Sequence, residues 1–401
     1  MRRMARNGLV QCLALAWSAT VWGGEGRLTL QPSAGEPVEA PISIPVPGSL
    51  AEGRYLLTPE GGSPAIPAVV VEEAERSSLI FISPMIAEPT TYELTKVGGG
   101  SSAEDGVTFV PQGENLQILV DGKELAVHRV DAGAKPFLFP LIGPTGDPFT
   151  RAYPMEEVEG ESKDHPHQRS FWFTHGAVNG VDFWSEIKNH GTIQETARFV
   201  EASGPVLGRL KTRDDWVGPD GVKICEDERV LTVYDTRTVR ILDFDIAIKA
   251  SEGPLVFGDT KEGTFGVRVA SSMDVDRKKG GKIRNADGLE DGATWGKPSS
   301  WVDYSGPVGD KTVGIAILND PESFRYPTPW HVRTYGLFAA NPFGLHDFGM
   351  EKSGEHSLAK GESIRLGYRV ILHAGDADAA RIADQFRAYA QPPNYELTLA
   401  E

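Results

Sequence analysis

The chain has 401 residues, which is long enough for two domains or more, each with a sizeable core. With 40% apolar and 24% charged residues, its composition is that of a globular protein and excludes extensive disorder. A formal charge of −16 argues against nucleic acid and against an anionic membrane surface as partners.

The N-terminus predicts a signal peptide over residues 1–23. A basic start at 1–6 is followed by an apolar run at 8–22 that is too short to span a bilayer comfortably, and then by the small residues Gly23 and Gly24. We therefore expect a secreted or periplasmic protein with no integral membrane association after cleavage; the alternative is a buried or anchoring N-terminal helix. Cleavage would remove three arginines, lower the charge from −16 to −19 and leave Cys225 as the one cysteine, so no internal disulfide is expected.

Residues 26–100 predict a small N-terminal β domain. Short apolar runs, such as the one at 68–71, alternate with turns rich in proline and glycine at 45–48 and 59–62. A run of glycine and serine at 98–102 has the composition of a flexible linker. We expect an immunoglobulin-like β-sandwich here.

Residues 107–390 predict a large domain of antiparallel strands with one C-terminal helix. Apolar residues alternate with polar ones at 242–248 and again at 364–372, the period of sheets with one buried face. A helical stripe of apolar residues follows Asp376. The chain shows neither an alternation of strands and helices nor a glycine-rich phosphate loop, so we predict an all-β protein whose large domain is an antiparallel β-supersandwich.

The stretch 164–176 carries three of the nine histidines, His165, His167 and His175. If this stretch is extended, these imidazoles and Arg169 share one face, because side chains two apart point the same way. Histidine changes charge near neutral pH, so such a cluster suits proton transfer or metal binding.

Two later stretches carry similar chemistry. Glu262 and Arg268 fall on one face if that segment is extended, and two prolines stiffen the loop before Trp330 and His331. Arg333, Tyr335 and Asn341 follow. Carbohydrate sites combine flat apolar rings with charged hydrogen-bonding groups, and Trp184 and Trp330 beside His, Arg and Glu fit that chemistry.

A metal site is a competing interpretation of the histidine stretch. His165, His167 and His175 could bind zinc, iron or manganese, with Glu186 or Asp182 as an oxygen donor. Their spacing matches no strict ligand signature, so we expect neither a metal nor another cofactor.

The motifs at 164–172, 179–184, 301–306, 327–333 and 341–344 resemble the PmoA family, over roughly residues 107–375. The resemblance implies a secreted bacterial protein associated with carbohydrate breakdown. The family name suggests a membrane copper protein, yet beyond the N-terminal run no apolar stretch approaches the ~20 residues of a spanning helix. This chain departs from the family pattern at Gln168, where a second histidine is usual, and at Ser170, where glycine is usual.

A looser similarity to galactose mutarotase-like supersandwiches implies a histidine near one strand and a glutamate on a later strand, both facing a sugar. By that analogy, the stretch at 164–171 and a later glutamate such as Glu262 could take these parts.

The leading hypothesis is a carbohydrate-active enzyme of unresolved reaction type: an epimerase, a lyase or a hydrolase. His167 and His331 would act as general acid and base, with Glu262 as a second acid–base group. The predicted ligand-binding residues are His165, Arg169, His175, Arg268, Trp184, Trp330, Arg333 and Asn341. The alternatives are a non-catalytic carbohydrate-binding protein and a metal-dependent enzyme that uses His165, His167 and His175. The oligomeric state is not predicted.

Overall fold

The computed structural model describes residues 25–31, 38–62, 64–73, 76–83, 88–98, 105–391 and 393–400. The predicted signal peptide at 1–23 lies outside these residues, and so does 99–102 of the predicted linker. Apart from one α-helix and three short 3₁₀ helices, the regular structure of the described residues consists of antiparallel strands, which confirms the all-β prediction. None of the described helices is long and apolar enough to cross a bilayer.

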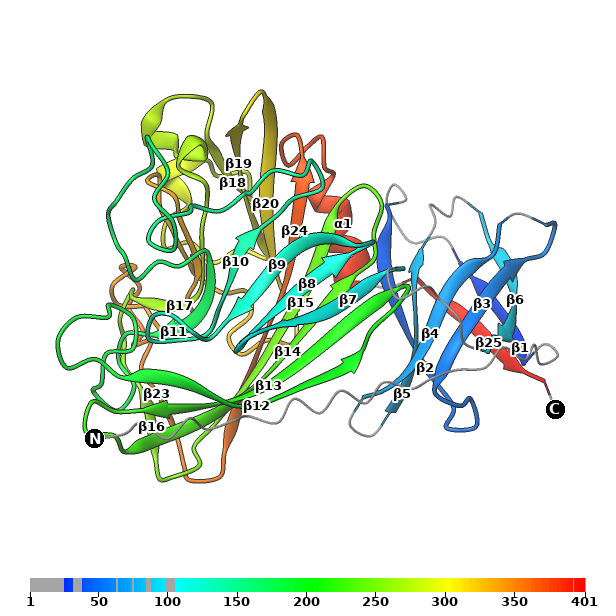
Figure 1. The fold of residues 1–401 in the computed structure, drawn as a ribbon, viewed down its shortest axis with the longest axis horizontal. Coiled ribbons are helices and arrows are strands. Elements are labelled where there is room, and N and C mark those ends of the chain that lie inside the picture. The colour runs from blue at the N-terminus through cyan, green and yellow to red at the C-terminus, as the bar shows by residue number, and fades with distance from the viewer. Residues whose placement is uncertain are drawn as a thin grey trace.

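The N-terminal unit is one continuous seven-stranded sheet, in the order β2-β5-β4-β3-β6-β1-β25, rather than two separate sheets. Its strands are β1 (Gly26–Leu30), β2 (Ala40–Val46), β3 (Gly53–Pro59), β4 (Ile66–Glu73), β5 (Arg76–Ser83), β6 (Thr90–Lys96) and β25 (Tyr395–Leu399). Apolar side chains from all of these strands share one core, so the sheet curves around it. The last strand, β25, returns from the C-terminus to pair with β1, which the predicted range of 26–100 did not include (Figure 1).

The large domain is built from two eight-stranded sheets. The first has the order β21-β22-β17-β11-β10-β9-β8-β7. Its strands are β7 (Val107–Gln112), β8 (Asn115–Val120), β9 (Lys123–Arg129), β10 (Phe137–Leu141), β11 (Phe171–His175), β17 (Gly263–Arg268), β21 (Trp330–Val332) and β22 (Leu337–Ala340).

The second sheet has the order β12-β13-β14-β15-β24-β20-β19-β18. Its strands are β12 (Thr192–Ala202), β13 (Leu207–Val217), β14 (Lys223–Tyr234), β15 (Arg240–Lys249), β18 (Lys282–Asn285), β19 (Trp301–Val308), β20 (Lys311–Asn319) and β24 (Ser363–Ala374). Outside the two sheets lie the pair β16 (Leu255–Phe257) and β23 (His356–Leu358) and the 3₁₀ helices η1 (Ser271–Met273), η2 (Val275–Arg277) and η3 (Asp291–Thr294).

The inner faces of the two large sheets form one apolar core, as alternation along the strands predicts. On β15 the inward residues are Leu242, Phe244, Ile246 and Ile248, and on β24 they include Leu366 and Val370. The first sheet contributes Phe171, Phe173, Phe265 and Phe338. Because alternate residues point outward, the outer face of the first sheet remains available for other chemistry.

The predicted C-terminal helix is present as α1 (Ile382–Ala390), and it lies between the large domain and the N-terminal sheet (Figure 1). Asp376 does not cap it directly; it accepts a hydrogen bond from Ala379 N in the turn before the helix. Gln385 Nε2 of α1 donates to the carbonyl of Glu39, next to β2, and the Glu39 carboxylate accepts a 2.8 Å bond from the Thr238 hydroxyl. Polar bonds thus join the two units.

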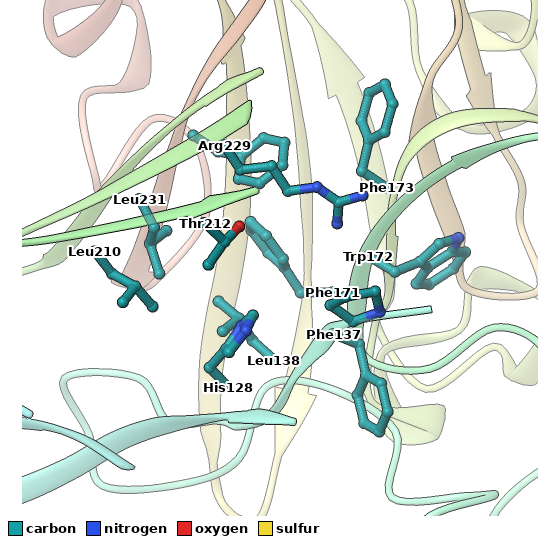
Figure 2. Close-up of a pocket in the computed structure, with 12 residues that line it drawn as sticks. His128, Phe137, Leu138, Phe171, Trp172, Phe173, Leu210, Thr212, Arg229 and Leu231 are labelled. Atoms are coloured by element: carbon teal, nitrogen blue, oxygen red, sulfur yellow. The ribbon is translucent and has the colours of Figure 1, made fainter. Parts of the chain in front are cut away.

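Charged groups are also buried between the two large sheets. Arg229 of β14 donates to both carboxylate oxygens of Asp227 at 2.9 and 2.8 Å and lies 3.4 Å from Asp214. Trp216 Nε1 donates to Asp227 at 2.6 Å. Figure 2 shows the guanidinium beside Phe173, whose ring centroid is 5.9 Å away.

We expect Arg229→Met to lower the free energy of unfolding by about 3–5 kcal/mol, because it leaves the buried Asp227 carboxylate without its cation. Arg213→Met is the matched control: this arginine of the adjacent strand β13 has 59% of its side chain exposed and pairs with Glu228, so its loss should cost at most about 1 kcal/mol. Urea unfolding of both variants measures the difference. Equal losses would contradict this assignment.

Candidate functional site

The candidate site lies on the outer face of the first large sheet. One row of directly paired residues crosses it from β11 to β21: Trp172, Gly266, Ala339 and His331. A Cβ on Gly266 would lie 2.6 Å from Trp172 Cζ2, so the indole covers the glycine and no side chain fits there. Adjacent strands are about 4.8 Å apart, so the row spans about 14 Å.

A loop over this face is held by two buried arginines that share one carboxylate. Arg151, which is fully buried, donates to Asp164 Oδ1 at 2.5 Å and to the carbonyls of Ser162 and His165. Arg268, on the outer face of β17, donates to the same Asp164 oxygen at 3.0 Å. Burial alone would raise the pKa of Asp164, but Arg268, His165 and Arg151 together lower it. This carboxylate therefore ties the loop to the sheet.

The same loop positions His165 against Tyr335. Their rings stack with centroids 5.1 Å apart and an angle of 7° between planes. The Arg268 guanidinium carbon lies 4.9 Å from the Tyr335 centroid, and Gln168 Oε1 accepts a 2.6 Å bond from Arg268. The His165 side chain remains 42% exposed, so it can meet a ligand.

His331 lies at the far end of the row and is buried. Trp295 Nε1 donates to its Nδ1 at 3.3 Å, and its ring lies 6.0 Å from that of Phe348. Burial, aided by the cations Arg333 and Lys261 and by His165, lowers the pKa of His331 to about 3. The charged groups at 165, 261 and 333 thus lie within electrostatic range of His331.

His167 lies at the near end, close to Trp184. Their centroids are 6.1 Å apart, and Trp184 in turn packs against Trp172 at 5.5 Å. Burial lowers the pKa of His167 to about 4, and the Lys135 ammonium contributes. Both His167 and His331 are therefore neutral imidazoles at pH 7, which does not support the prediction that both take up and release a proton near neutrality.

Arg169 is engaged in an ion-pair network beside His167. Its Nη2 donates to Glu186 at 3.0 Å, and Lys135 Nζ donates to the other Glu186 oxygen at 2.6 Å. Lys135 is 2% exposed. Arg169 thus holds the wall of the site and shares the Glu186 carboxylate with Lys135.

Glu262 and Lys261 border the same face and are half-exposed. Lys261 Nζ lies 3.4 Å from Glu262 Oε1, with side-chain exposures of 43% and 39%. Burial is the main cause of the raised pKa of Tyr335, and the Glu262 carboxylate adds to it. The Glu262 carboxylate is thus within electrostatic range of Tyr335, and its acid–base role stays a prediction.

Other predicted site residues belong to the framework instead, among them Trp184, which is 1% exposed and packs against Trp172. Trp330 points into the core between the sheets and donates from Nε1 to the Ser299 carbonyl at 2.9 Å. Asn341 is fully buried, and its amide oxygen accepts bonds from the backbone N–H groups of Phe343 and Gly344. His175 faces the core side of β11, packs 4.9 Å from Phe343, and hydrogen-bonds the Gly258 carbonyl at 2.8 Å.

The predicted metal cluster of His165, His167 and His175 is not formed. Strand β11 starts only at Phe171, and the preceding loop has His165 and Ser170 at φ of +43° and +57°, so the two-residue parity breaks there. The oxygen donors proposed for it are engaged elsewhere, Glu186 with Lys135 and Asp182 with the N–H groups of Trp184 and Ser185. Within the described part of the chain, no three His, Cys, Asp or Glu residues gather in a way that could hold a metal ion.

Several residues of this face were missed by sequence reasoning. Arg151 and Trp295 stand alone in the sequence, far from the histidine stretch and from His331, and only the fold brings them together. Lys261 lies next to Glu262, so its position could have indicated it, whereas Tyr335 was already noted in the sequence beside Arg333. We call the residues of this face the outer-face site: His165, His167, Lys261, Glu262, Arg268, Trp295, His331, Arg333 and Tyr335.

Two hollows elsewhere are less suited to a ligand. The cavity in Figure 2 lies between the large sheets, among side chains such as His128, Phe171 and Leu231; its volume of about 30 Å³ suits a water molecule or two. A cleft of about 640 Å³ lies between the N-terminal sheet and the second large sheet. Its central charges are already paired, Arg369 with Asp243 at 2.7 Å and Arg365 with Asp245.

Comparison with known proteins identifies a family and distant structural similarity. The model of "Family of unknown function (DUF6807)" matches residues 115–387. The resemblance to the PmoA family stays a sequence-based prediction. A search of curated proteins finds no match.

Two solved structures from Enterococcus faecalis are similar to the chain. One is a protein in the glycosyl hydrolase family 38, at 9% identity and a TM-score of 0.40, covering 94% of this chain and 47% of that one. The other is an alpha-mannosidase from strain V583, at 10% identity and a TM-score of 0.40, covering 94% and 46%. The chain spans about half the length of each, and likeness of this size says nothing of ligand or activity.

The low pKa of His331 has a consequence for acid stability. Below pH 6.5 the unfolded chain binds a proton at this imidazole and the folded protein does not, so stability falls as pH drops toward 3. We expect wild type to lose up to about 2–3 kcal/mol more than His331→Gln between pH 7 and pH 4.5, at 1.36 kcal/mol for each pH unit. Urea unfolding across this range measures the difference. A His331 ring resonance that titrates near pH 6.5 by NMR would contradict the prediction.

Proposed function

The chain belongs to the DUF6807 family, whose function is unknown, and we propose that it binds and acts on a carbohydrate at the outer-face site. In this proposal it works outside the cytoplasm, where the predicted signal peptide would direct it. The observation that carries the proposal is the arrangement of half-buried aromatic rings, neutral imidazoles and cations on one solvent-facing side of a rigid sheet.

The chemistry of each group suits a sugar. A neutral imidazole offers one hydrogen-bond donor and one acceptor. His167, which is neutral at pH 7, can therefore donate to a sugar hydroxyl or accept from one. Trp295 and Tyr335 are half-buried and present apolar surface with polar ends. Arg333 supplies a fork of donors.

Catalysis in this proposal rests on Glu262 rather than on the two imidazoles. His167 and His331 stay unprotonated at pH 7, and the row beneath them spans about 14 Å, which exceeds hydrogen-bond reach. Glu262 is 39% exposed and lies near the His165–Tyr335 stack, so it can reach a bound ligand as a proton donor or acceptor.

A non-catalytic carbohydrate-binding protein is the second candidate. The observation that favours it is the neutrality of both imidazoles, because a binding site needs no titrating pair. The two candidates share one site and differ only in whether turnover occurs.

Binding is tested with Trp295→Ala on a panel of oligosaccharides measured by calorimetry. We expect the affinity of the bound glycan to fall roughly 5- to 30-fold, because an aromatic contact contributes about 1–2 kcal/mol. Tyr395→Ala, an exposed aromatic residue of β25 in the N-terminal sheet, should leave the affinity unchanged. Equal effects of the two variants would remove the outer-face site from the proposal.

Turnover is tested with Glu262→Gln on any glycan of the panel that wild type converts. We expect kcat to fall about 10²- to 10⁴-fold with binding retained, since the amide cannot transfer the proton. Glu60→Gln, with 54% of its side chain exposed at the end of β3, is the control. If wild type binds a glycan but converts none of the panel, the binding protein is the correct function.

A further inference from the structure

We infer that the carbohydrate bound at the outer-face site is acidic, and that Arg333 binds its anionic substituent, a carboxylate or a sulfate ester. This inference rests on the proposed function and adds the class of ligand. It starts from a cation that has no counter-ion on this face.

The Arg333 guanidinium makes neither a hydrogen bond nor an ion pair with any residue that the structure describes. Its contacts are with aromatic rings: its central carbon lies 5.5 Å from the Trp295 centroid and 5.8 Å from that of Tyr335. Such rings attract a cation and leave its N–H groups free to donate elsewhere. The side chain is half-buried, so these donors are oriented and can be reached from solvent.

The carboxylates near Arg333 are already engaged. Asp164 is shared by Arg151 and Arg268, and its second oxygen lies 2.8 Å from His165 Nδ1. Glu262 lies 3.4 Å from Lys261. Asp274, below Gly336, forms an ion pair with Arg277 at 3.4 Å.

Four cations, Arg151, Lys261, Arg268 and Arg333, lie on this face of a chain whose net charge is −16. Arg151 and Arg268 share Asp164, and the Glu161 and Asp274 carboxyl groups also act on them. Lys261 pairs with Glu262, so Arg333 is the one of these four cations that has no ion pair among the described residues. Its charge acts on its neighbours, because Arg333 and Lys261 both lower the pKa of the His331 imidazole. A local positive charge on an acidic protein favours an anionic ligand at that place.

The geometry of arginine defines the group it would hold. A guanidinium donates two parallel hydrogen bonds to a carboxylate or a sulfate, and a neutral hydroxyl can accept only part of that fork. With Trp295 and Tyr335 fixing the plane of Arg333, the anionic group would lie at the guanidinium edge. The sugar rings would then extend along the row toward His165 and His167.

The test compares matched glycans that differ only in charge, using the full chain. Calorimetry measures oligogalacturonate against its neutral methyl ester, and a sulfated oligosaccharide against its desulfated form. We expect wild type to bind one acidic member about 10- to 100-fold more tightly than its neutral partner, as charge-assisted bonds allow. The pair that shows the preference identifies carboxylate or sulfate.

Arg333→Gln should abolish the preference for the acidic glycan, because the affinity for the acidic glycan falls much further than the affinity for its neutral partner, which loses at most a hydroxyl contact. Arg333→Lys keeps the charge but loses the pair of parallel donors, so its affinity for the acidic glycan should lie between that of wild type and that of Arg333→Gln. Arg27→Gln, with its side chain 72% exposed in the N-terminal sheet, should behave like wild type. Unchanged circular dichroism and Tm would show that the Arg333 variants are folded.

The outcomes separate the inference from the proposed function. Binding of neutral glycans with equal affinity for their acidic partners, or an acid preference that survives Arg333→Gln, overturns the inference and leaves the proposed function standing. Failure of every glycan to bind overturns both.

Discussion

The site depends on one carboxylate shared by two buried arginines. Asp164 accepts from Arg151 at 2.5 Å and from Arg268 at 3.0 Å, and one arginine belongs to the loop while the other belongs to strand β17. Burial lowers the pKa of Arg151 to about 10, and the nearby charge of Arg268 adds to this, so the two cations tolerate one another only with an anion between them. The loop therefore stays against the sheet, because moving Asp164 away would leave Arg151 and Arg268 buried without the carboxylate that they share.

This constraint sets the electrostatics of the whole face. Arg151 and Arg268 share Asp164 and are also acted on by Glu161 and Asp274, whereas Arg333 adds a cation without an ion pair that, together with Lys261, acts on His331. Burial keeps both imidazoles neutral, with Arg333 and Lys261 adding to this effect at His331 and Lys135 adding to it at His167, so histidines that sequence reasoning assigned to proton transfer become hydrogen-bonding groups. The structure thus links the shape of the loop to the kind of ligand that the face can accept.

Much of the fold was predictable because alternation along a strand records which side is buried. The pattern at 242–248 and at 364–372 predicted the core faces of β15 and β24 correctly. The same rule shows why Trp330 and His331 could not both face a ligand, because adjacent residues of a strand point to opposite faces of the sheet. Trp330 points into the core, and His331 points to the outer face. The break in parity before Phe171 could not be seen, because it depends on left-handed backbone at His165 and Ser170, which neither residue type indicates.

The fold explains how Ser170 and Gln168, the two departures from the PmoA-like pattern, are accommodated. Ser170 adopts φ +57°, a conformation that glycine reaches without steric cost, and here its hydroxyl donates to Thr150 Oγ1 at 2.8 Å. Gln168 is 1% exposed and accepts from Arg268 at 2.6 Å. A histidine in its place would have to accept the same bond and would therefore be neutral, because a buried imidazolium beside this guanidinium would be repelled. The amide thus keeps the hydrogen-bond pattern that such an imidazole would supply, and the charge of the face is the same with either side chain.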